Sequence, residues 1–167
     1  MAVRSRWSRR YRNLLMWLGH RGLFTWLGPH VFAPVDAWLY PRVHGAVVSA
    51  GPPVLPLLML TTARPRTNKP HSVPLVYLER GTDLLVVASN WGRDRHPGWS
   101  ENLLAEPSAI VQIGRRRQPV YARLATPVEK ASLWPELIQL CPVWQSYEAR
   151  SGRDLRVFVL TTDNDRR

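Results

Sequence analysis

Apolar runs of strand length, separated by turn-forming residues, dominate the chain after its first third. Gly81 lies between two of these runs and provides the permissive backbone that a tight hairpin needs. Short strands joined by hairpin turns are typical of an antiparallel sheet that curls into a barrel. Six strands are predicted: residues 55–62, 72–78, 84–89, 108–114, 120–125 and 156–162.

Helix signals stand between these strands. Thr126 is a good N-cap, Pro127 suits the first helical position, and Glu129 has capping-box spacing, so a helix is predicted from there to about Leu140. The order of helices and strands predicts an α+β barrel. Further short helices are expected after Pro97, in residues 34–40 and in residues 141–152.

Residues 1–33 form a basic leader ahead of the barrel domain, which is predicted to span residues 34–163. The spacing of the leader's apolar residues predicts an amphipathic helix. Two interpretations stay open: a peripheral anchor on an anionic membrane, where each arginine contributes about 1 kcal/mol, or a helix packed on the barrel. The apolar run 14–19 is too short to cross a bilayer, and an export signal is not expected.

The charge indicates an anionic partner. The formal net charge is +11, and Lys69 and Lys130 are the only lysines among 23 basic residues. Nucleic acid is not expected, because no recognition motif accompanies the charge. Hydrophobic residues at 45% match a globular domain. The lone Cys141 excludes an intramolecular disulfide, and the histidines lack the spacing of metal ligands, so no metal is expected.

Two stretches carry candidate chemistry. The basic turn of residues 64–71 suits a phosphate or carboxylate, with about 1.5 to 3 kcal/mol for each charge-assisted hydrogen bond, although a solvated hairpin tip explains it equally well. The second stretch is residues 87–107, where Trp99 and Asn102 lie three residues apart and therefore share one face of a helix. An aromatic wall and an amide would hold a planar ring, but the spacing alone favours a core tryptophan and a surface asparagine.

Three segments resemble a known family: "LMLTTARPRTNKPHSVPLVYL", "VVASNWGRDRHPGWSENLLAEP" and "VYARLATPVEKASLWPELIQLCPVWQSYEARSGRDLRVFVL". The family is the deazaflavin (F420)-dependent nitroreductases and F420H2-dependent quinone reductases, of the split β-barrel flavoprotein superfamily. The resemblance implies a split β-barrel of the FMN-binding, pyridoxamine-oxidase-like type with flanking helices. It also implies coenzyme F420, an 8-hydroxy-5-deazaflavin, as the cofactor.

The resemblance implies roles for individual residues. Those expected at the anionic tail of the cofactor are Arg64, Arg66, Thr67, Lys69 and His71. Those expected at the deazaflavin ring are Ser89, Asn90, Trp99 and Asn102. The acceptor pocket is expected to contain Trp91, Cys141, Trp144 and Tyr147, with Tyr147 and Ser89 as the catalytic residues.

The chain departs from the pattern of this family at several of these positions. Asn68 replaces the second glycine of the basic turn, Trp91 replaces a glycine, and Cys141 and Trp144 replace two tyrosines. A rearranged phosphate turn and a narrowed or redirected acceptor pocket are therefore expected.

The function implied is that of an enzyme that transfers a hydride from F420H2 to a hydrophobic acceptor, such as a quinone or a nitroaromatic. The expected location is the cytoplasm, or the inner face of the plasma membrane if the leader is an anchor. Two alternatives stay open: a non-catalytic deazaflavin-binding or membrane-associated protein, and a split-barrel reductase that uses FMN.

Overall fold

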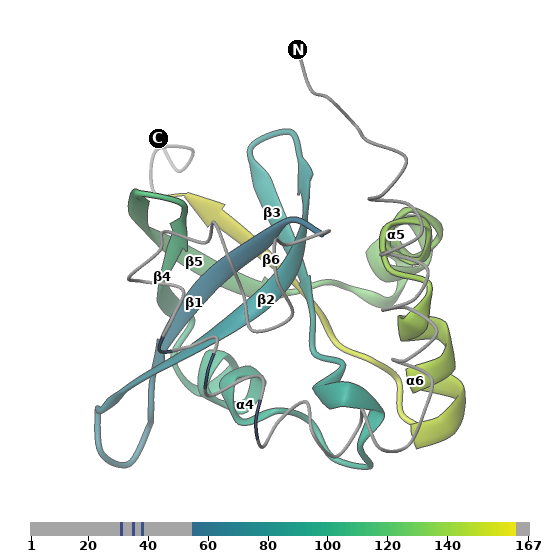
Figure 1. Ribbon diagram of the computed structural model, residues 1–167, viewed down its shortest axis with the longest axis horizontal. Helices are drawn as coiled ribbons and strands as arrows, with labels where there is room; N and C mark the ends of the chain where they lie inside the picture. Colours follow the sequence, from purple (N-terminus) through teal and green to yellow (C-terminus); the bar gives the residue numbers. More distant parts are fainter. Residues whose placement is uncertain (1–30, 32–34, 36–37, 39–54, 163–167) are drawn as a thin grey trace.

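The computed structural model describes residues 31, 35, 38 and 55–162 (Figure 1). Residues 55–162 contain six strands, three α-helices and one short 3₁₀ helix. In chain order these are β1 (Leu57–Ala63), β2 (Pro70–Arg80), β3 (Asp83–Val87), η2 (Asn90–Gly92), α4 (Gly98–Ala105), β4 (Ser108–Ile113), β5 (Arg116–Leu124), α5 (Pro127–Leu140), α6 (Val143–Ser151) and β6 (Val157–Thr162).

The six strands close into an antiparallel barrel in the order β1-β2-β3-β6-β5-β4, which confirms the predicted α+β split barrel. β2 and β5 are longer than the apolar runs that predicted them. Each is joined to its neighbouring strand by a two-residue turn, so the polar residues at the strand ends also pair across the turn. Arg80 pairs with Asp83 across one turn, and Ile113 pairs with Arg116 across the other. Gly81 has a φ of +62° in the first turn, as the hairpin requires.

One apolar cluster fills the inside of the barrel. Alternate residues of each strand point inward, as the two-residue period of a strand dictates. Leu58, Leu60 and Val86 are fully buried, and Phe158 is 1% exposed. Burying a side chain of this size stabilises the fold by about 1.5 to 3 kcal/mol, so this cluster is a principal source of stability.

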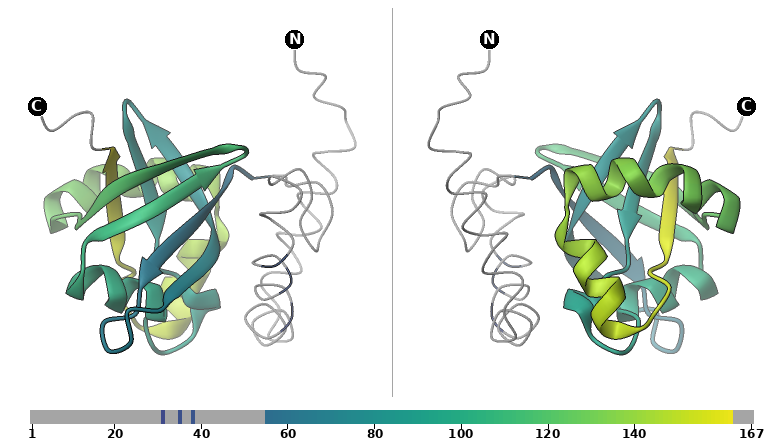
Figure 2. Two further views of the ribbon diagram at one scale, coloured as in Figure 1. Left: turned by 90° about the vertical axis from the view of Figure 1, so that its left-hand side faces the viewer. Right: turned by 90° about the vertical axis from the view of Figure 1, so that its right-hand side faces the viewer.

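A second cluster covers the outer faces of β3 and β6. Leu85 and Val159 point away from the barrel interior and pack with Leu137 of α5 and Trp144 of α6. Figure 2 shows α5 and α6 lying against this side of the barrel. β3 and β6 are therefore buried on both faces, which explains why their apolar runs are continuous rather than alternating.

The predicted start of α5 is confirmed. The Thr126 hydroxyl accepts the Glu129 amide at 3.2 Å, and the Glu129 carboxylate accepts the Thr126 amide at 2.8 Å, which completes a capping box. Arg123 also donates two hydrogen bonds to Glu129, and this pairing lowers the pKa of Glu129 to about 2.

The predicted leader helix and most of residues 34–40 lie outside the described residues. Of this part, Val35 and Trp38 are helical and exposed. Among the described residues, no helix combines the length and the apolar character needed to span a membrane.

Candidate functional site

One end of the barrel gathers the segments with predicted chemistry. β1 and β3 both run antiparallel to β2, so their C-terminal ends point the same way. The turn of residues 64–69 after β1 and the segment of residues 88–97 after β3 therefore lie at the same end of the barrel, together with α4. Figures 1 and 2 show α4 and the β1–β2 turn at the lower end of the barrel.

The β1–β2 turn carries several exposed cations. The Arg64 amide donates to the Lys69 carbonyl at 3.0 Å, and the Asn68 amide donates to the Arg64 carbonyl at 2.8 Å, which folds the turn tightly. Asn68 has a φ of 52°, a conformation that asparagine tolerates better than most residues. Arg64, Arg66 and Lys69 are exposed, and none has an ion-pair partner within residues 55–162. The turn can therefore accept an anionic ligand.

A chain of polar contacts links α4 to the end of β1 and the start of β2, next to this turn. The Asn102 amide donates to the Thr62 hydroxyl at 3.0 Å, and that hydroxyl donates to the His71 carbonyl at 3.4 Å. Asn102 is only 8% exposed, so it does not take the surface position that its spacing alone favours. Burial lowers the pKa of His71, and Arg64 lowers it further. His71 is therefore predominantly neutral at physiological pH.

Trp99 belongs to the barrel core. Its side chain is 4% exposed, and its ring centroid lies 5.6 Å from that of Phe158 at an interplanar angle of 58°. This is the position that the spacing alone favoured. Contact between Trp99 and a cofactor ring stays a prediction.

Ser89 and Asn90 follow β3 at the rim of the barrel. The Ser89 carbonyl accepts a hydrogen bond from Arg153, whereas its hydroxyl has no hydrogen-bond partner among the described residues. The Asn90 amide nitrogen donates to the Arg95 carbonyl at 2.8 Å, so it stabilises the loop. Ser89 is therefore the better placed of the two to bind a ligand.

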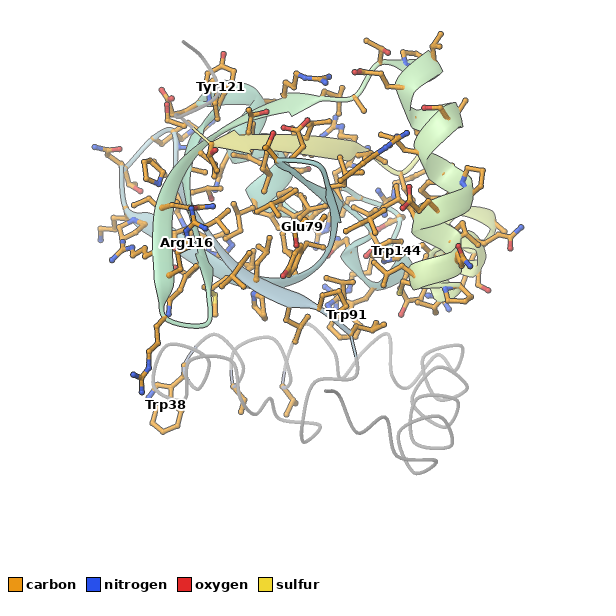
Figure 3. The ribbon with its side chains drawn as sticks, turned by 90° about the horizontal axis from the view of Figure 1, so that it is seen from above. Trp38, Glu79, Trp91, Arg116, Tyr121 and Trp144 are labelled. Atoms are coloured by element: carbon orange, nitrogen blue, oxygen red, sulfur yellow. The ribbon has the colours of Figure 1, made fainter. Side chains whose placement is uncertain are left out.

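The 3₁₀ turn η2 lies directly on α6. A Cβ atom at Gly92 would lie 2.4 Å from the Arg150 guanidinium and 2.8 Å from the Tyr147 ring, so only glycine fits this approach. Figure 3 shows Trp91 and Trp144 on the side of the barrel that the helices cover. The structure thus brings η2, with Trp91, onto the helix that carries Trp144 and Tyr147.

Three of the residues predicted to line the acceptor pocket are buried: Cys141 at the end of α5, and Trp144 and Tyr147 of α6. Cys141 and Trp144 are each 4% exposed and Tyr147 is 5% exposed, all within the second cluster. Burial raises the pKa of Tyr147 to about 12, with Cys141 adding to the effect and Arg150 opposing it. Burial also raises the pKa of the Cys141 thiol to about 12, so it stays protonated and is a poor nucleophile.

The Tyr147 side chain leaves the hydrogen bonding of its hydroxyl unsatisfied within the described part of the chain. It has no hydrogen-bond partner among the described residues, although Arg150 lies 5.2 Å from the ring centroid. Because its pKa is about 12, the group carries its proton at neutral pH. It can therefore donate a hydrogen bond to a bound acceptor.

Sequence reasoning missed Arg150 and Arg153, which donate to backbone carbonyls of the Ser89–Arg93 segment. In the sequence, the only signal for these two arginines was their spacing of three residues.

At the opposite end of the barrel is a cavity of about 390 Å³ whose lining includes Tyr77, Glu79 and Arg116. Figure 3, viewed from that end, shows Glu79 over the barrel and Arg116 at its rim. No group of three metal-ligating side chains occurs in the described part of the chain.

Comparison with known proteins identifies the family. The family described as F420H(2)-dependent quinone reductase matches residues 35–162. This chain belongs to that family. An F420H(2)-dependent quinone reductase of Mycobacterium tuberculosis is 32% identical over 143 residues, which cover 81% of this chain and 95% of the relative. The predicted family is therefore confirmed.

Two solved structures have a similar fold. A structure described as an F420-H2 dependent reductase (FDR-A) has 29% sequence identity and a TM-score of 0.59, covering 63% of this chain and 93% of that chain. Another, described as a domain-swapped dimer, has 28% identity and a TM-score of 0.60, covering 74% and 94%.

Proposed function

We propose that this protein is an F420H2-dependent quinone reductase. One observation carries the proposal: a tight turn with three cations that have no ion-pair partner within residues 55–162 lies at the same end of the barrel as Ser89, whose hydroxyl has no hydrogen-bond partner in that range. An anionic tail and a polar ring can both be bound at such a site. Family membership supports F420 as the molecule that has both.

The β1–β2 turn fits the anionic tail of the cofactor. Arg66 and Lys69 are exposed and have no competing carboxylate among the described residues, so their charges can be directed to a phosphate. Asn68 preserves the left-handed turn that a glycine would otherwise supply, so its substitution does not block this role. Thr67 and Arg64 are further candidates on the same turn.

The polar rim fits the ring. Ser89 would donate or accept a hydrogen bond through its hydroxyl. The Asn102 amide is held in place by its hydrogen bond to Thr62. The Trp99 ring is held by its contact with Phe158. Both α4 residues are therefore fixed before any ligand binds, and this lowers the entropic cost of binding.

The acceptor would lie near Trp91, Trp144 and Tyr147. Coenzyme F420H2 supplies a hydride from a ring carbon when it is bound. The chain would then orient the acceptor, exclude water and donate a hydrogen bond from the protonated Tyr147 hydroxyl, whose pKa is about 12. The indole rings suit a flat, hydrophobic acceptor such as a quinone.

The test compares three reductants. Purified protein is mixed anaerobically with F420H2, NADPH or reduced FMN, with menadione as the acceptor. Oxidation of F420H2 alone is the expected result. Tight F420 binding without turnover would instead favour a non-catalytic protein, and oxidation of reduced FMN would favour an FMN reductase.

We also propose a peripheral position on the cytoplasmic face of the membrane, through residues 1–33. This proposal rests on the leader's arginines and apolar spacing. Flotation with anionic liposomes tests it, using the full chain and a chain that lacks residues 1–30. Only the full chain is expected to float, and equal flotation of both would overturn the anchor.

A further inference from the structure

Arg153, which follows α6, binds the segment that carries Ser89. Its Nη2 donates to the Ser89 carbonyl at 3.0 Å, and its Nε donates to the Arg93 carbonyl at 2.8 Å. Its Nη1 lies 2.8 Å from Nδ1 of His96. All three nitrogens of the guanidinium are thus engaged by one segment. This side chain therefore supports the protein's own loop rather than an external anion.

A second arginine continues the pattern. Nη2 of Arg150 donates to the Trp91 carbonyl at 2.9 Å. The carbonyls of Ser89, Trp91 and Arg93 therefore each accept a hydrogen bond from one of two arginines, which lie on or just after α6. We call Arg150 and Arg153 the arginine clamp.

The clamp holds an unfavourable backbone conformation. Asn90, Trp91 and Gly92 have consecutive φ values of 47°, 58° and 70°. Left-handed backbone is costly for a residue with a bulky side chain such as Trp91, so the surrounding structure must maintain it. The clamp bonds to carbonyls within and on both sides of this turn. Backbone strain held in this way is found preferentially at functional sites.

We propose that Arg153 is a positioning residue for hydride transfer. The inference rests on the proposed function, because the segment it holds carries Ser89 at the expected ring site. Arg153 also keeps η2 against α6, where Gly92 lies beside the Tyr147 ring. It thereby sets the position of the expected ring site relative to the expected acceptor site. It does not contact the β1–β2 turn, so binding of the anionic tail should not depend on it.

The test separates positioning from binding. Arg153→Met and Arg153→Lys are compared with Arg123→Met, which removes an arginine from an exposed ion pair with Glu129. Single-turnover oxidation of F420H2 by menadione gives the hydride-transfer rate, and titration gives the Kd for F420. A misplacement of about 1 Å can reduce a rate by about 100-fold, so we expect both Arg153 variants to be about 10- to 100-fold slower. The Kd should change by less than about threefold.

Lysine should not rescue the rate, because an ammonium cannot reproduce three hydrogen bonds from a planar fork. Wild-type transfer in Arg153→Lys, or a rate in Arg153→Met within twofold of that in Arg123→Met, would overturn the proposal. If Arg153→Met does not fold, Arg153→Lys carries the test.

Limited proteolysis measures the clamp without any cofactor. Arg95 is exposed and lies within the clamped segment, and Arg66 lies on the other loop. In Arg153→Met, tryptic cleavage after Arg95 should become faster relative to cleavage after Arg66. Unchanged cleavage after Arg95 would overturn the role of Arg153 in the clamp. Failure of the wild-type protein to oxidise F420H2 would contradict the proposed function instead, so the two failures are distinguishable.

Discussion

The two loops at the candidate site use arginine in opposite ways. On the β1–β2 turn, Arg64 and Arg66 are exposed and have no ion-pair partner within the described residues. On the segment after β3, the carbonyls are held by Arg150 and Arg153 from the other side of the site. A net charge of +11 therefore overstates the charge available to a ligand. Part of it is committed to the protein's own backbone.

This difference assigns separate tasks to the two loops. Free cations on a turn can attract an anion and are screened by salt. A guanidinium bonded to carbonyls cannot do so without breaking those bonds. We therefore expect changes in the β1–β2 turn to affect affinity, and changes around the Ser89–His96 segment to affect turnover.

The largest effect is expected from the free cations. Replacing Arg66 and Lys69 together by alanine removes two charge-assisted contacts of about 1.5 to 3 kcal/mol each, so the Kd for F420 should rise by about 100-fold or more. Titration at two salt concentrations should also show that the Kd for F420 depends less on salt in the double variant than in wild type. The matched control is Arg115→Ala with Arg117→Ala, two exposed arginines at the other end of the barrel. Equal losses in both double variants would contradict the tail site.

The next effect concerns the tyrosine beneath the other loop. Tyr147→Phe removes a hydroxyl that has no hydrogen-bond partner among the described residues, so the thermal midpoint should hardly change. Turnover with menadione should fall by about tenfold, as one hydrogen bond to the acceptor is lost. Tyr77→Phe, at the opposite end of the barrel, is the control. Unchanged turnover in Tyr147→Phe would remove this residue from the mechanism.

A smaller effect is expected from residues with left-handed backbone, which occur in both loops. Trp91→Gly relieves a cost of about 1 to 2 kcal/mol and opens the space beside α6, so the KM for a bulky quinone should fall by a few fold. Asn68→Gly is the comparison in the β1–β2 turn, where asparagine is already tolerated, and should leave that KM unchanged. Steady-state kinetics with quinones of different size distinguishes the two. A higher KM in Trp91→Gly would show that the indole binds the acceptor instead of narrowing its pocket.

The smallest effect is that of pH. Burial, followed by Arg156 and Arg153, lowers the pKa of His96 below its usual 6.5, with Glu101 and Asp154 opposing the shift. The unfolded chain therefore binds a proton at His96 more readily than the folded protein does. The contacts of neutral His96 stabilise the fold fully above about pH 6.5, and this stabilisation is lost as the pH falls through the folded pKa. The thermal midpoint should decrease toward pH 5 less steeply in His96→Asn than in wild type, by about 2 °C. Identical slopes would show that His96 does not titrate against the clamp.

Local patterns predicted most of the fold. The apolar runs identified all six strands, and Thr126 with Glu129 identified the start of α5, because both signals act between neighbours in the chain. The polar start of β5 was missed, because pairing across a two-residue turn leaves no apolar pattern. The family, and with it the cofactor class, also followed from the sequence.

The candidate site was predicted only in part. Trp99 and Asn102 were correctly placed on one face of a helix, and their spacing favoured the observed burial of Trp99 but not that of Asn102. The burial of Asn102 depends on Thr62, which is 40 residues away in the chain.

By itself, then, the sequence determined the strands, the helix cap and the family, since these depend on residue types at short and regular spacing. The tertiary structure alone decided which arginines of residues 55–162 bond to the protein's own backbone and which have no ion-pair partner in that range. Arg153 and the Ser89 carbonyl lie 64 residues apart, and backbone carbonyls are chemically alike along the whole chain. Only the closed barrel, with α6 packed beside the end of β3, determines which carbonyls this guanidinium can reach.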